Sequence, residues 1–575
     1  MAYDVKIAGA RIVDGTGAPG FVGDVGVRDG RIVAMGHAPD VARETVNADG
    51  LVLAPGFVDI HTHYDVQVLW DPMMTISPWH GVTTVVVGSC GFGVAPTRPA
   101  DRDLILRTLE RVEAMSYDAL TAGLGASWPF ETFPQYMDAV EASGSGINIG
   151  VMLGHTPVRV YAMGAAAVER TATPDEVAVM KELVREGMRA GAMGFATSVS
   201  TVHVGYAGKP VPSRFADFAT ETIELARALG ESGQGLFHYN AARQPHFDNY
   251  VALADASGRP VCWTPLLSGQ LGPGRHREAL TRSAELIAQG YRITPQTAVR
   301  PIVSEFEFES PVVFDTWKLF APVRTASDSA ARRRIYADPD FRRLFREEVA
   351  GRGGNDDFFS GGAAEGETRR RSFTLTEMSF FPPDKSLEGR KLVDVAAERG
   401  AHACDLLLDL ALASDLKARF RMPLVNYDEA EVTELLLDPN IVIGLGDGGA
   451  HMSQLCDACY PTYLLGHFVR DRKIMALERA IWMITGRTAE VYGIADRGRL
   501  AVGRPADLAL FDPATIAAGP LERVNDMPAG ADRLISKPVG MHGVWVNGTR
   551  LPPPGEALPM GARLPGRLLR HGRAS

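Results

Sequence analysis

The sequence predicts an α/β protein: a (β/α)8 barrel (TIM barrel) with a small β-sandwich domain formed by both chain ends. Three observations support this. The chain has 575 residues, which suits one large domain and a smaller one. Its middle alternates short apolar runs with helix-like segments, whereas its ends show alternating strands and glycine turns. Apolar residues make up 46% of the chain and charged residues 22%, so a sizeable core is available.

Both chain ends consist of short strand-like pieces broken by glycines. The N-terminal end contains "DVKIAGARIVDGTG", and the C-terminal end shows the same pattern in "GRLAVGRPADLALFD". Alternating apolar and polar residues are typical of strands with one buried face. We therefore predict a β-sandwich built from residues 1–54 and 487–575. The final segment, "RLPGRLLRHGRAS", is basic, and we expect it to be mobile.

The middle of the chain, residues 55–486, predicts the barrel. Continuous apolar strands that alternate with helices are typical of parallel strands buried on both faces, and eight of them close a barrel. The apolar runs are Val52–Ile60, Val82–Val87, Ile147–Leu153, Ala192–Ala196, Gly235–Phe237, Pro260–Trp263, Tyr291–Thr294 and Ile441–Leu445. A charged, glycine-rich segment near 320–375 interrupts this rhythm, and it predicts an inserted, solvated surface helix and loop.

The strongest functional signal is "GFVDIHTHYD", in which His61 and His63 end an apolar strand. The two-residue period of a strand places both side chains on one face. The carboxyl ends of barrel strands line the active site. The ring nitrogens of two imidazoles on an inward face rarely all find hydrogen-bond partners without a metal. This spacing is also typical of metal ligands. The alternative is a pair of hydrogen-bonded polar residues at a strand tip.

Further potential ligands follow other apolar runs: Cys90, His155, His238 and Asp447. Together with the histidine pair they predict a metal site at the mouth of the barrel. Imidazole, thiolate and carboxylate ligands favour zinc, as one or two divalent ions. Taken alone, His155 could position a loop and Cys90 could be a small buried hydrophobe.

Asp447 lies in "IGLGDGGAH", where glycines on both sides let the backbone bend tightly around a carboxylate. Next to a metal, this carboxylate can accept a proton from water and pass it to a leaving group. The alternative is a helix N-cap. His451 lies on the same loop and either faces the substrate or caps the following helix. The pair Cys456 and Cys459 lacks the context of a redox or zinc site, so we interpret it as two packed thiols.

These motifs resemble the amidohydrolase superfamily, and within it the N-acyl-D-amino-acid deacylase (D-aminoacylase) group. The resemblance covers nearly the whole chain and rests on "APGFVDIHTHYD", "GVTTVVVGSCGFG", "GHTPVR", "GLFHYN" and "VIGLGDGGAH". It implies that His61, His63 and Asp447 bind a weakly held metal and that Cys90 and His238 bind a tighter zinc. It also implies that Asp447 is the general acid–base.

The sequence departs from that group at the sixth strand. The group usually carries a Ser-His-x-Lys type motif there, whereas this strand reads "PVCWTPLLSG", with Thr264 and Pro265 at the serine and histidine positions. Proline cannot bind a metal, so we expect about one tightly bound zinc, and an apolar substrate group against this strand. The substrate-binding residues that we predict are His155, Arg159, Thr264, Arg300 and His451.

The sequence therefore predicts a metal-dependent hydrolase of a C–N bond, most simply an amide. Two alternatives stay open: a hydrolase of a cyclic amide or another acyl substrate, and a non-catalytic homologue that acts in binding or assembly. A net charge of −10 without a long basic block argues against nucleic acid as a partner. No apolar run approaches the length of a membrane span. Five cysteines and no recognisable signal peptide favour the cytoplasm, and a homo-oligomer is left open.

Overall fold

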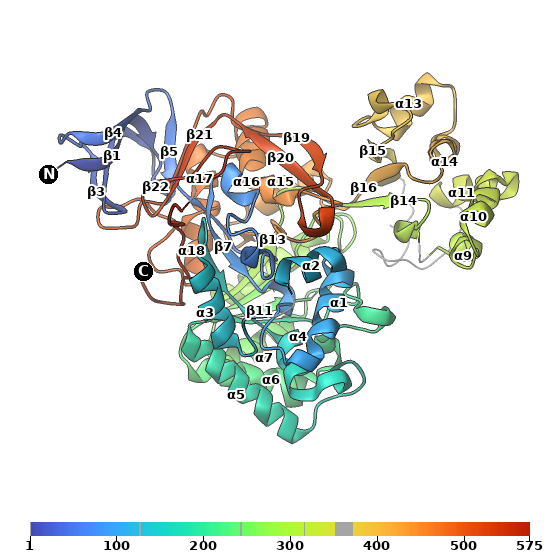
Figure 1. Cartoon of the computed structure of the whole chain (residues 1–575), viewed down its shortest axis with the longest axis horizontal. Helices are drawn as coiled ribbons and strands as arrows, with labels where there is room; N and C mark the ends of the chain where they lie inside the picture. The colour runs from blue at the N-terminus through green and yellow to red at the C-terminus, as the bar shows by residue number, and fades with distance from the viewer. Residues whose placement is uncertain are drawn as a thin grey trace. The chain divides into compact units, whose positions relative to one another are not determined.

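The computed structural model describes residues 2–125, 128–241, 244–314, 317–350, 372–559 and 561–574. The chain forms two compact units. Unit 1 consists of Met1–Pro265, Leu280–Val299 and Leu436–Ser575, and unit 2 of Leu266–Ala279 and Arg300–Leu435. Figure 1 shows the elements of both units along the chain. Among the described residues, no helix combines the length and the apolar character that crossing a lipid bilayer requires.

Two parallel sheets form the centre of unit 1. The larger has the strand order β17-β13-β12-β11-β10-β9, and the smaller has the order β6-β7-β8. The strands are β6 (Phe57–Asp59), β7 (Val82–Val87), β8 (Asn148–Val151), β9 (Leu153–Gly154), β10 (Gly194–Ser198), β11 (Leu236–Asn240), β12 (Val261–Thr264), β13 (Ile293–Thr297) and β17 (Val442–Ile443). Every residue of β7, β8, β10, β11 and β12 is buried, as expected of strands covered on both faces.

The two parallel sheets approach each other on both sides. On one side only Met152 separates β8 from β9. On the other side Thr62, just past β6, forms a parallel bridge with Gly448, just past β17. The backbone N–H of His63 also donates to the Gly448 carbonyl at 2.7 Å. The segments that follow β6 and β17 therefore lie side by side, although they are far apart in the sequence.

Helices follow the strands of the larger sheet and cover its outer side (Figure 1). They include α5 (Pro174–Ala190), α6 (Ile223–Glu231) and α7 (Phe247–Ser257). Helix α5 shows how the sequence sets such a helix: Thr173 and Glu176 form a capping box at its start, and Gly191, with φ of 102°, ends it. Other helices in unit 1 or at its border include α1 (Arg102–Val112), α2 (Tyr117–Leu124), α3 (Phe133–Ser143), α4 (His155–Met163), α8 (His276–Ala288), α17 (Leu477–Met483) and α18 (Gly486–Val491).

The two chain ends share one eight-stranded sheet. Its order is β22-β21-β18-β5-β1-β2-β3, and β4 pairs with β1. The strands are β1 (Tyr3–Ile12), β2 (Phe21–Arg28), β3 (Arg31–Gly36), β4 (Ala42–Asn47), β5 (Val52–Pro55), β18 (Leu508–Phe511), β21 (Met541–Val546) and β22 (Thr549–Arg550). The core of this sheet joins Ile7 and Ile12 from the first end with Leu508 and Trp545 from the second. A separate hairpin consists of β19 (Ala517–Val524) and β20 (Arg533–Val539).

The basic C-terminal tail is not the mobile segment that we expected. Leu568 forms a parallel bridge with Ile149 of β8, and the N–H of Leu569 donates to the Ile149 carbonyl at 2.7 Å. The Leu569 side chain is buried in a core cluster with residues of the parallel strands, such as Val58 and Val86. Apolar residues within the basic tail, rather than its net charge, therefore decide where it lies.

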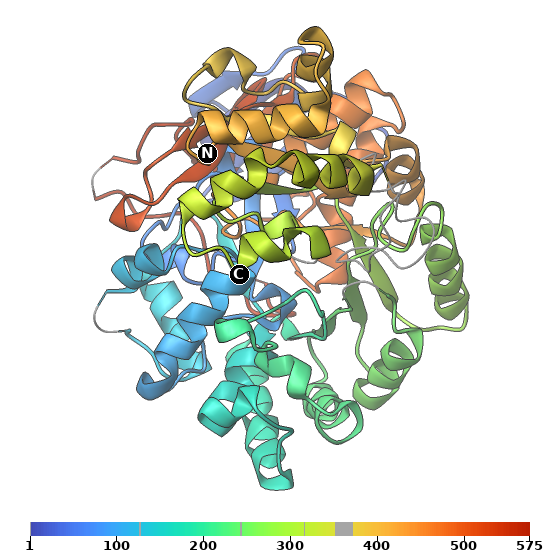
Figure 2. The ribbon, with the colours of Figure 1, turned by 90° about the vertical axis from the view of Figure 1, so that its right-hand side faces the viewer.

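Unit 2 contains an antiparallel sheet of order β14-β16-β15. Its elements, some shown in Figure 2 in yellow-green to gold, are β14 (Ile302–Glu307), β15 (Glu377–Phe380), β16 (Arg419–Val425), α9 (Ala321–Arg324), α10 (Ser329–Ala337), α11 (Pro339–Val349), α13 (Leu392–Glu398) and α14 (Ala403–Ala413). Helix α15 (Glu429–Leu437) lies at its border. The expected insertion near 320–375 falls within this unit, but residues 351–371 of it lie outside the described residues.

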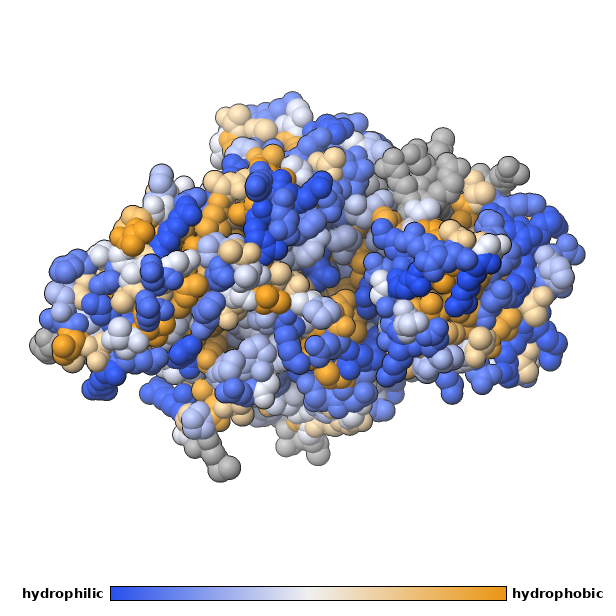
Figure 3. All heavy atoms as spheres, turned by 90° about the horizontal axis from the view of Figure 1, so that it is seen from above, coloured by the Kyte–Doolittle hydropathy of each residue, from blue (hydrophilic) through white to orange (hydrophobic). Residues whose placement is uncertain are grey.

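The described part of that segment contributes to an aromatic core. Phe320, Phe345 and Phe420 are fully buried and pack with Phe314. In α11 the buried residues Phe341 and Phe345 recur with helical spacing, while its arginines stay on the surface. Hydrophilic residues accordingly predominate on the side of unit 2 that Figure 3 shows at the right. The segment thus contains a helix, as predicted, but that helix buries an apolar face instead of being solvated on all sides.

Candidate functional site

Four of the predicted ligands lie together at the ends of the parallel strands. Nε2 of His61 lies 3.3 Å from Sγ of Cys90 and 3.5 Å from Oδ1 of Asp447. Nε2 of His63 lies 3.7 Å from the same Asp447 oxygen. The ligand atoms of His61, His63 and Cys90 all lie within 4.8 Å of one another. The first, second and eighth of the predicted strands thus bring their terminal polar side chains to one point.

His238 joins this cluster from β11. Its ring centroid lies 5.4 Å from that of His61, and the side chain is fully buried. Neither of its ring nitrogens has a hydrogen-bond partner among the described residues, and the same holds for Oδ1 of Asp447. Buried polar atoms without partners are costly, so these atoms point to a missing charged or polar group.

The donor set fits a zinc ion. In a tetrahedral zinc site, ligand atoms about 2.0–2.3 Å from the metal lie about 3.5 Å from one another. The distances of 3.3, 3.5 and 3.7 Å that join His61, His63, Cys90 and Asp447 agree with this spacing. Imidazole, thiolate and carboxylate are also the ligands that zinc prefers.

The backbone around the cluster is specialised to present these side chains. Cys90 and Asp447 both have positive φ angles, of 56° and 43°. Gly446 lies directly before Asp447, and a Cβ atom at this position would lie 2.1 Å from Oδ2 of the buried Asp59. Only glycine fits there without a shift of Asp59, whose Oδ1 accepts the N–H of His61 at 3.1 Å.

A second layer of side chains orients the ligands. Nδ1 of His61 lies 2.5 Å from Oε1 of Gln296 at the end of β13, and the amide of Asn240 donates to Sγ of Cys90 at 2.9 Å. With Nδ1–H donated to Gln296, Nε2 of His61 keeps the lone pair that a metal requires. Sequence reasoning missed both residues. Asn240 lies two residues after His238 on the same face of β11, and that spacing could have identified it.

Glu113 is a further residue that sequence reasoning missed. It lies at the end of α1, is 3% exposed, and places Oε1 3.4 Å from Nδ1 of His63. Its backbone carbonyl accepts the N–H of His451 at 2.6 Å, and Oε2 lies 3.7 Å from Nε2 of His451. Glu113 therefore contacts both the His63 ring and the loop that carries Asp447. No motif in the sequence distinguishes this glutamate.

The two paired histidines have opposite electrostatic environments. Burial lowers the pKa of His61 to about 4, although Asp447 opposes this shift. Burial also lowers the pKa of His63, but the carboxylates of Glu113 and Asp447 outweigh it and raise the value to about 9. Burial raises the pKa of Asp447, yet its contact with His63 and the charge of His61 bring it down to about 2. The site is therefore strongly polarised, with Asp447 ionised at neutral pH.

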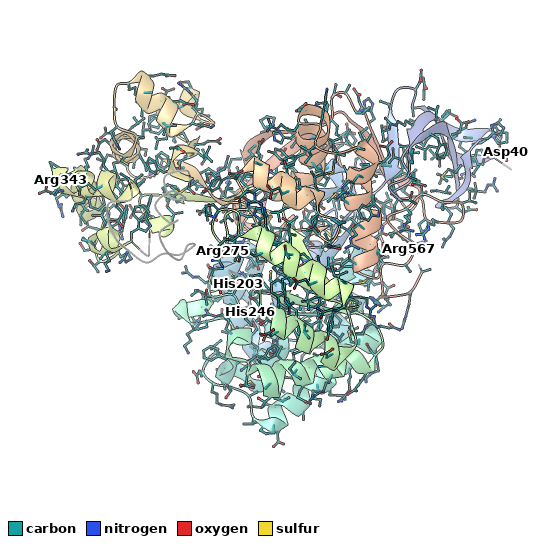
Figure 4. The ribbon with its side chains drawn as sticks, turned by 180° about the vertical axis from the view of Figure 1, so that it is seen from behind. Asp40, His203, His246, Arg275, Arg343 and Arg567 are labelled. Atoms are coloured by element: carbon teal, nitrogen blue, oxygen red, sulfur yellow. The ribbon has the colours of Figure 1, made fainter. Side chains whose placement is uncertain are left out.

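Two more histidines lie near the cluster. His451 follows Asp447 on the same loop with 31% of its side chain exposed, and burial lowers its pKa despite the charge of Asp447. His203, labelled in Figure 4, was not predicted. Its Nδ1 lies 2.7 Å from Oγ of Ser198 at the end of β10. Burial, followed by repulsion from His451, His63 and His61, lowers its pKa to about 3.

His155 and Arg159 form a different, fully buried network. Nε2 of His155 lies 2.8 Å from Oε1 of Glu221, and Nη1 of Arg159 donates to both carboxylate oxygens of Glu221, at 2.8 and 2.7 Å. The backbone carbonyl of Arg170 accepts a further bond from Arg159. We predicted that both residues bind substrate, but in the structure both contact Glu221 instead. Arg159 is therefore poorly placed to bind a substrate carboxylate.

The remaining predicted residues are separated between the units. Thr264 ends β12 in register with Asn240, and its buried Oγ1 has no partner among the described residues. Its neighbour Trp263 stacks on Tyr250 of α7 at 5.3 Å, so it packs against the covering helix. Arg300 belongs to unit 2, where its backbone carbonyl accepts a bond from Asn426.

Known proteins share this sequence pattern and fold. A model of the amidohydrolase family matches residues 44–551. The chain is 30% identical to a D-aminoacylase from Alcaligenes xylosoxydans xylosoxydans over 557 residues, which cover 95% of this chain and 94% of that protein. It is also similar to a solved N-acyl-D-glutamate deacylase from Bordetella bronchiseptica, with 26% identity and a TM-score of 0.65 over 99% of this chain and 100% of that one.

That N-acyl-D-glutamate deacylase was solved with zinc and a phosphonate inhibitor that mimics the tetrahedral intermediate of its reaction. A solved D-aminoacylase with a binuclear metal centre is 25% identical to this chain, with a TM-score of 0.64 over 99% of this chain and 100% of that chain. In that enzyme one metal activates and a second attenuates activity. The likeness in each case spans the whole length of both proteins.

Proposed function

The chain belongs to the amidohydrolase family, and from this premise we propose that it hydrolyses the amide bond of N-acyl-D-amino acids in a metal-dependent reaction. The convergence of His61, His63, Cys90, His238 and Asp447 on one point carries the proposal. The relatives named as D-aminoacylase and N-acyl-D-glutamate deacylase support the substrate class.

The architecture that we propose for this activity is a closed (β/α)8 barrel over residues 55–486, with a β-sandwich from residues 1–54 and 487–575. The near continuity of β8 with β9 and the bridge between Thr62 and Gly448 support closure of the parallel sheets. The sheet shared by both chain ends supports the second domain. In this arrangement the cluster lies where the strands end, as barrel active sites do.

His61, His63, Cys90, His238 and Asp447 would hold the metal. When bound there, a divalent ion would supply Lewis acidity toward a substrate carbonyl and toward water, which hydrolysis at neutral pH requires. The pKa of the Cys90 thiol is raised by burial, while the amide of Asn240 opposes this by donating to Sγ. A cation is therefore needed to hold Cys90 as a thiolate.

Asp447 has the position and charge of the proton-transfer group. Its Oδ1 faces the two histidines and has no hydrogen-bond partner among the described residues, so it is free to accept a proton from the attacking water. Asp447 then donates that proton to the departing amine nitrogen, which completes cleavage of the amide. Glu113 and Gln296 hold the rings of His63 and His61 in place during these steps.

The test is a panel of N-acetyl D- and L-amino acids, assayed with purified protein before and after chelation and with the Asp447→Asn variant as a control. We expect hydrolysis of D substrates that chelation abolishes and zinc restores. If the protein hydrolysed only cyclic amides, the proposed substrate class would be wrong and the cyclic-amide alternative would be supported. A metal-free protein that hydrolyses nothing after zinc is added would support a non-catalytic homologue.

A further inference from the structure

An apolar cavity opens directly beside His63, within unit 1. Its lining joins His63 to Met115, Met452 and Met527, together with Leu120 of α2. The three methionines come from separate places: the α1–α2 connection, the loop that follows Asp447, and the loop before residue 528. Leu120 is 1% exposed, and Met115 and Met527 are 8% exposed, so the cavity is an interior feature.

The same three methionines line a second cavity that continues outward. This outer cavity has a volume of about 220 Å³ and extends to Glu110 and Asp532. Met452 and Gly449 also border the space next to Asp447. Three adjacent spaces with shared lining residues therefore extend from the candidate proton-transfer group, past His63 and along the methionines, to Glu110 and Asp532.

Backbone hydrogen bonds hold these loops together. The N–H of His451 donates to the Glu113 carbonyl, and the N–H of Leu534 donates to the Met452 carbonyl, each at 2.6 Å. Helix α2 also packs against the turn at Pro528–Gly530. The methionine wall is thus fixed to the same backbone that presents Asp447 and the Glu113 partner of His63.

The chemistry of the walls selects an uncharged, apolar occupant. Methionine side chains are flexible and polarisable, so they adapt to alkyl groups of differing shape. No lysine or arginine is among the described residues that line the two methionine cavities, whereas Glu110 and Asp532 border the outer one. Asp532 is already paired with Arg523, so a substrate carboxylate in this space would be desolvated without gaining a basic partner.

We propose that the two methionine cavities together bind the acyl chain of the substrate. They would make the enzyme selective for linear, apolar acyl groups longer than acetyl. The inference rests on the proposed function. In an N-acyl amino acid the acyl half is uncharged, whereas the other half carries a carboxylate next to the scissile nitrogen. Only the acyl half therefore suits a space that methionines line and that lacks a lysine or arginine to bind a carboxylate.

The test compares N-acetyl-, N-butyryl-, N-hexanoyl- and N-octanoyl-D-alanine with N-succinyl-D-alanine in the zinc-loaded enzyme. Burial of each methylene group is expected to raise kcat/KM roughly threefold until the cavity is full. Met527→Trp fills the cavity, and it should lower the ratio of hexanoyl to acetyl kcat/KM at least tenfold. Met35→Trp, in β3 and outside the cavity, is the matched control and should leave the ratio unchanged.

Binding to the zinc-loaded Asp447→Asn variant, measured by calorimetry, gives a second readout that needs no turnover. Tighter binding of the hexanoyl than of the acetyl compound, lost in Met527→Trp, supports the acyl cavity even if the wild type hydrolyses none of these substrates and the proposed function fails. Equal affinities and equal kcat/KM across the series, or a preference for the succinyl compound, would overturn the inference while leaving the amidase activity intact. Binding of none of the compounds would overturn both.

Discussion

The carboxylate of Glu113 lies 3.4 Å from Nδ1 of His63, while the other nitrogen of that ring faces Asp447. One buried glutamate thereby fixes which edge of the imidazole points into the cluster. His61 has an equivalent arrangement, with Gln296 on Nδ1 and Cys90 on the Nε2 side. The two histidines of a single strand end therefore rely on partners from α1 and β13.

We expect Glu113→Gln to weaken zinc binding about 10- to 100-fold, the usual effect of removing a partner behind a metal-binding histidine. The amide preserves the shape of the side chain, so loss of the negative charge is the main change. A zinc competition titration with a chromophoric chelator measures the effect. Glu110→Gln, one helical turn away beside the outer cavity, is the control. If Glu113→Gln left the zinc affinity unchanged, Glu113 would contribute to packing but not to metal binding through His63.

The purified protein should contain about one equivalent of zinc rather than two. Strand β12 carries no imidazole: Cys262 packs in the core and Thr264 ends the strand. A second ion would therefore lack a strand-six ligand. Elemental analysis after gentle purification counts the metal, and Cys90→Ala should reduce it further. Two firmly held ions per chain would show that a residue outside the cluster replaces Pro265.

Asp447→Asn should lower turnover by at least about 100-fold, the scale expected for a general acid–base group. The asparagine retains the volume of the side chain, so folding should change little. Steady-state kinetics and thermal unfolding, measured on the same preparation, separate the two effects. Turnover close to the wild-type value would assign proton transfer to another residue, with His451 as the next candidate.

The buried network of Glu221 predicts a stability effect rather than a catalytic one. Removing one partner of a buried ion pair leaves an uncompensated charge, so Arg159→Leu should destabilise unit 1 by about 3–5 kcal/mol. Arg185→Leu removes an exposed ion pair and should destabilise the protein much less, because water and salt screen such a pair. Chemical denaturation measures both. Equal losses would mean that the buried pair has no special role.

The same network should make the protein sensitive to acid. Burial raises the pKa of Glu221, but bonds from His155 and Arg159 outweigh it and lower the value below 4.5. Its stabilising contribution is therefore full above 4.5 and is lost as the pH falls through the lowered value. Burial lowers the pKa of His155, so stability also declines below 6.5. In Glu221→Gln, the free energy of unfolding should vary less with pH below 4.5, whereas the decline below 6.5 should persist, because Glu221 no longer raises the pKa of His155.

The sequence predicted the ligand cluster because its signal is local. His61, Cys90 and Asp447 each follow a short apolar run, and parallel strands carry such positions to one edge. The family match confirms the resemblance on which their roles were assigned. Glu113 and Gln296 have no such signal, because an ordinary helix end and strand end become partners of the histidines only through the fold.

The sequence was less informative about the direction of side chains, about segments with a high average charge, and about partners that are far apart in the chain. Strand alternation alone left the direction of Trp263 open, and contact with Tyr250 settles it. The charged segment near 320–375 predicted a solvated surface helix and loop, because charged residues dominate its composition and mask the spacing of the buried Phe341 and Phe345. Arg159 looked available for substrate, since its partner Glu221 is 62 residues away.

The pairing of Leu568 with Ile149 has a consequence for synthesis in the cell. The ribosome makes β8 long before it makes the segment that lies beside it. A nascent chain therefore lacks the partner of Ile149 until Leu568 has been synthesised, and the core cluster of the parallel strands stays incomplete until Leu569 follows. Chains truncated before Gly566 would lack the Leu568 bridge and the buried Leu569 side chain, so we expect them to expose Ile149 and to be cleaved more readily by proteases.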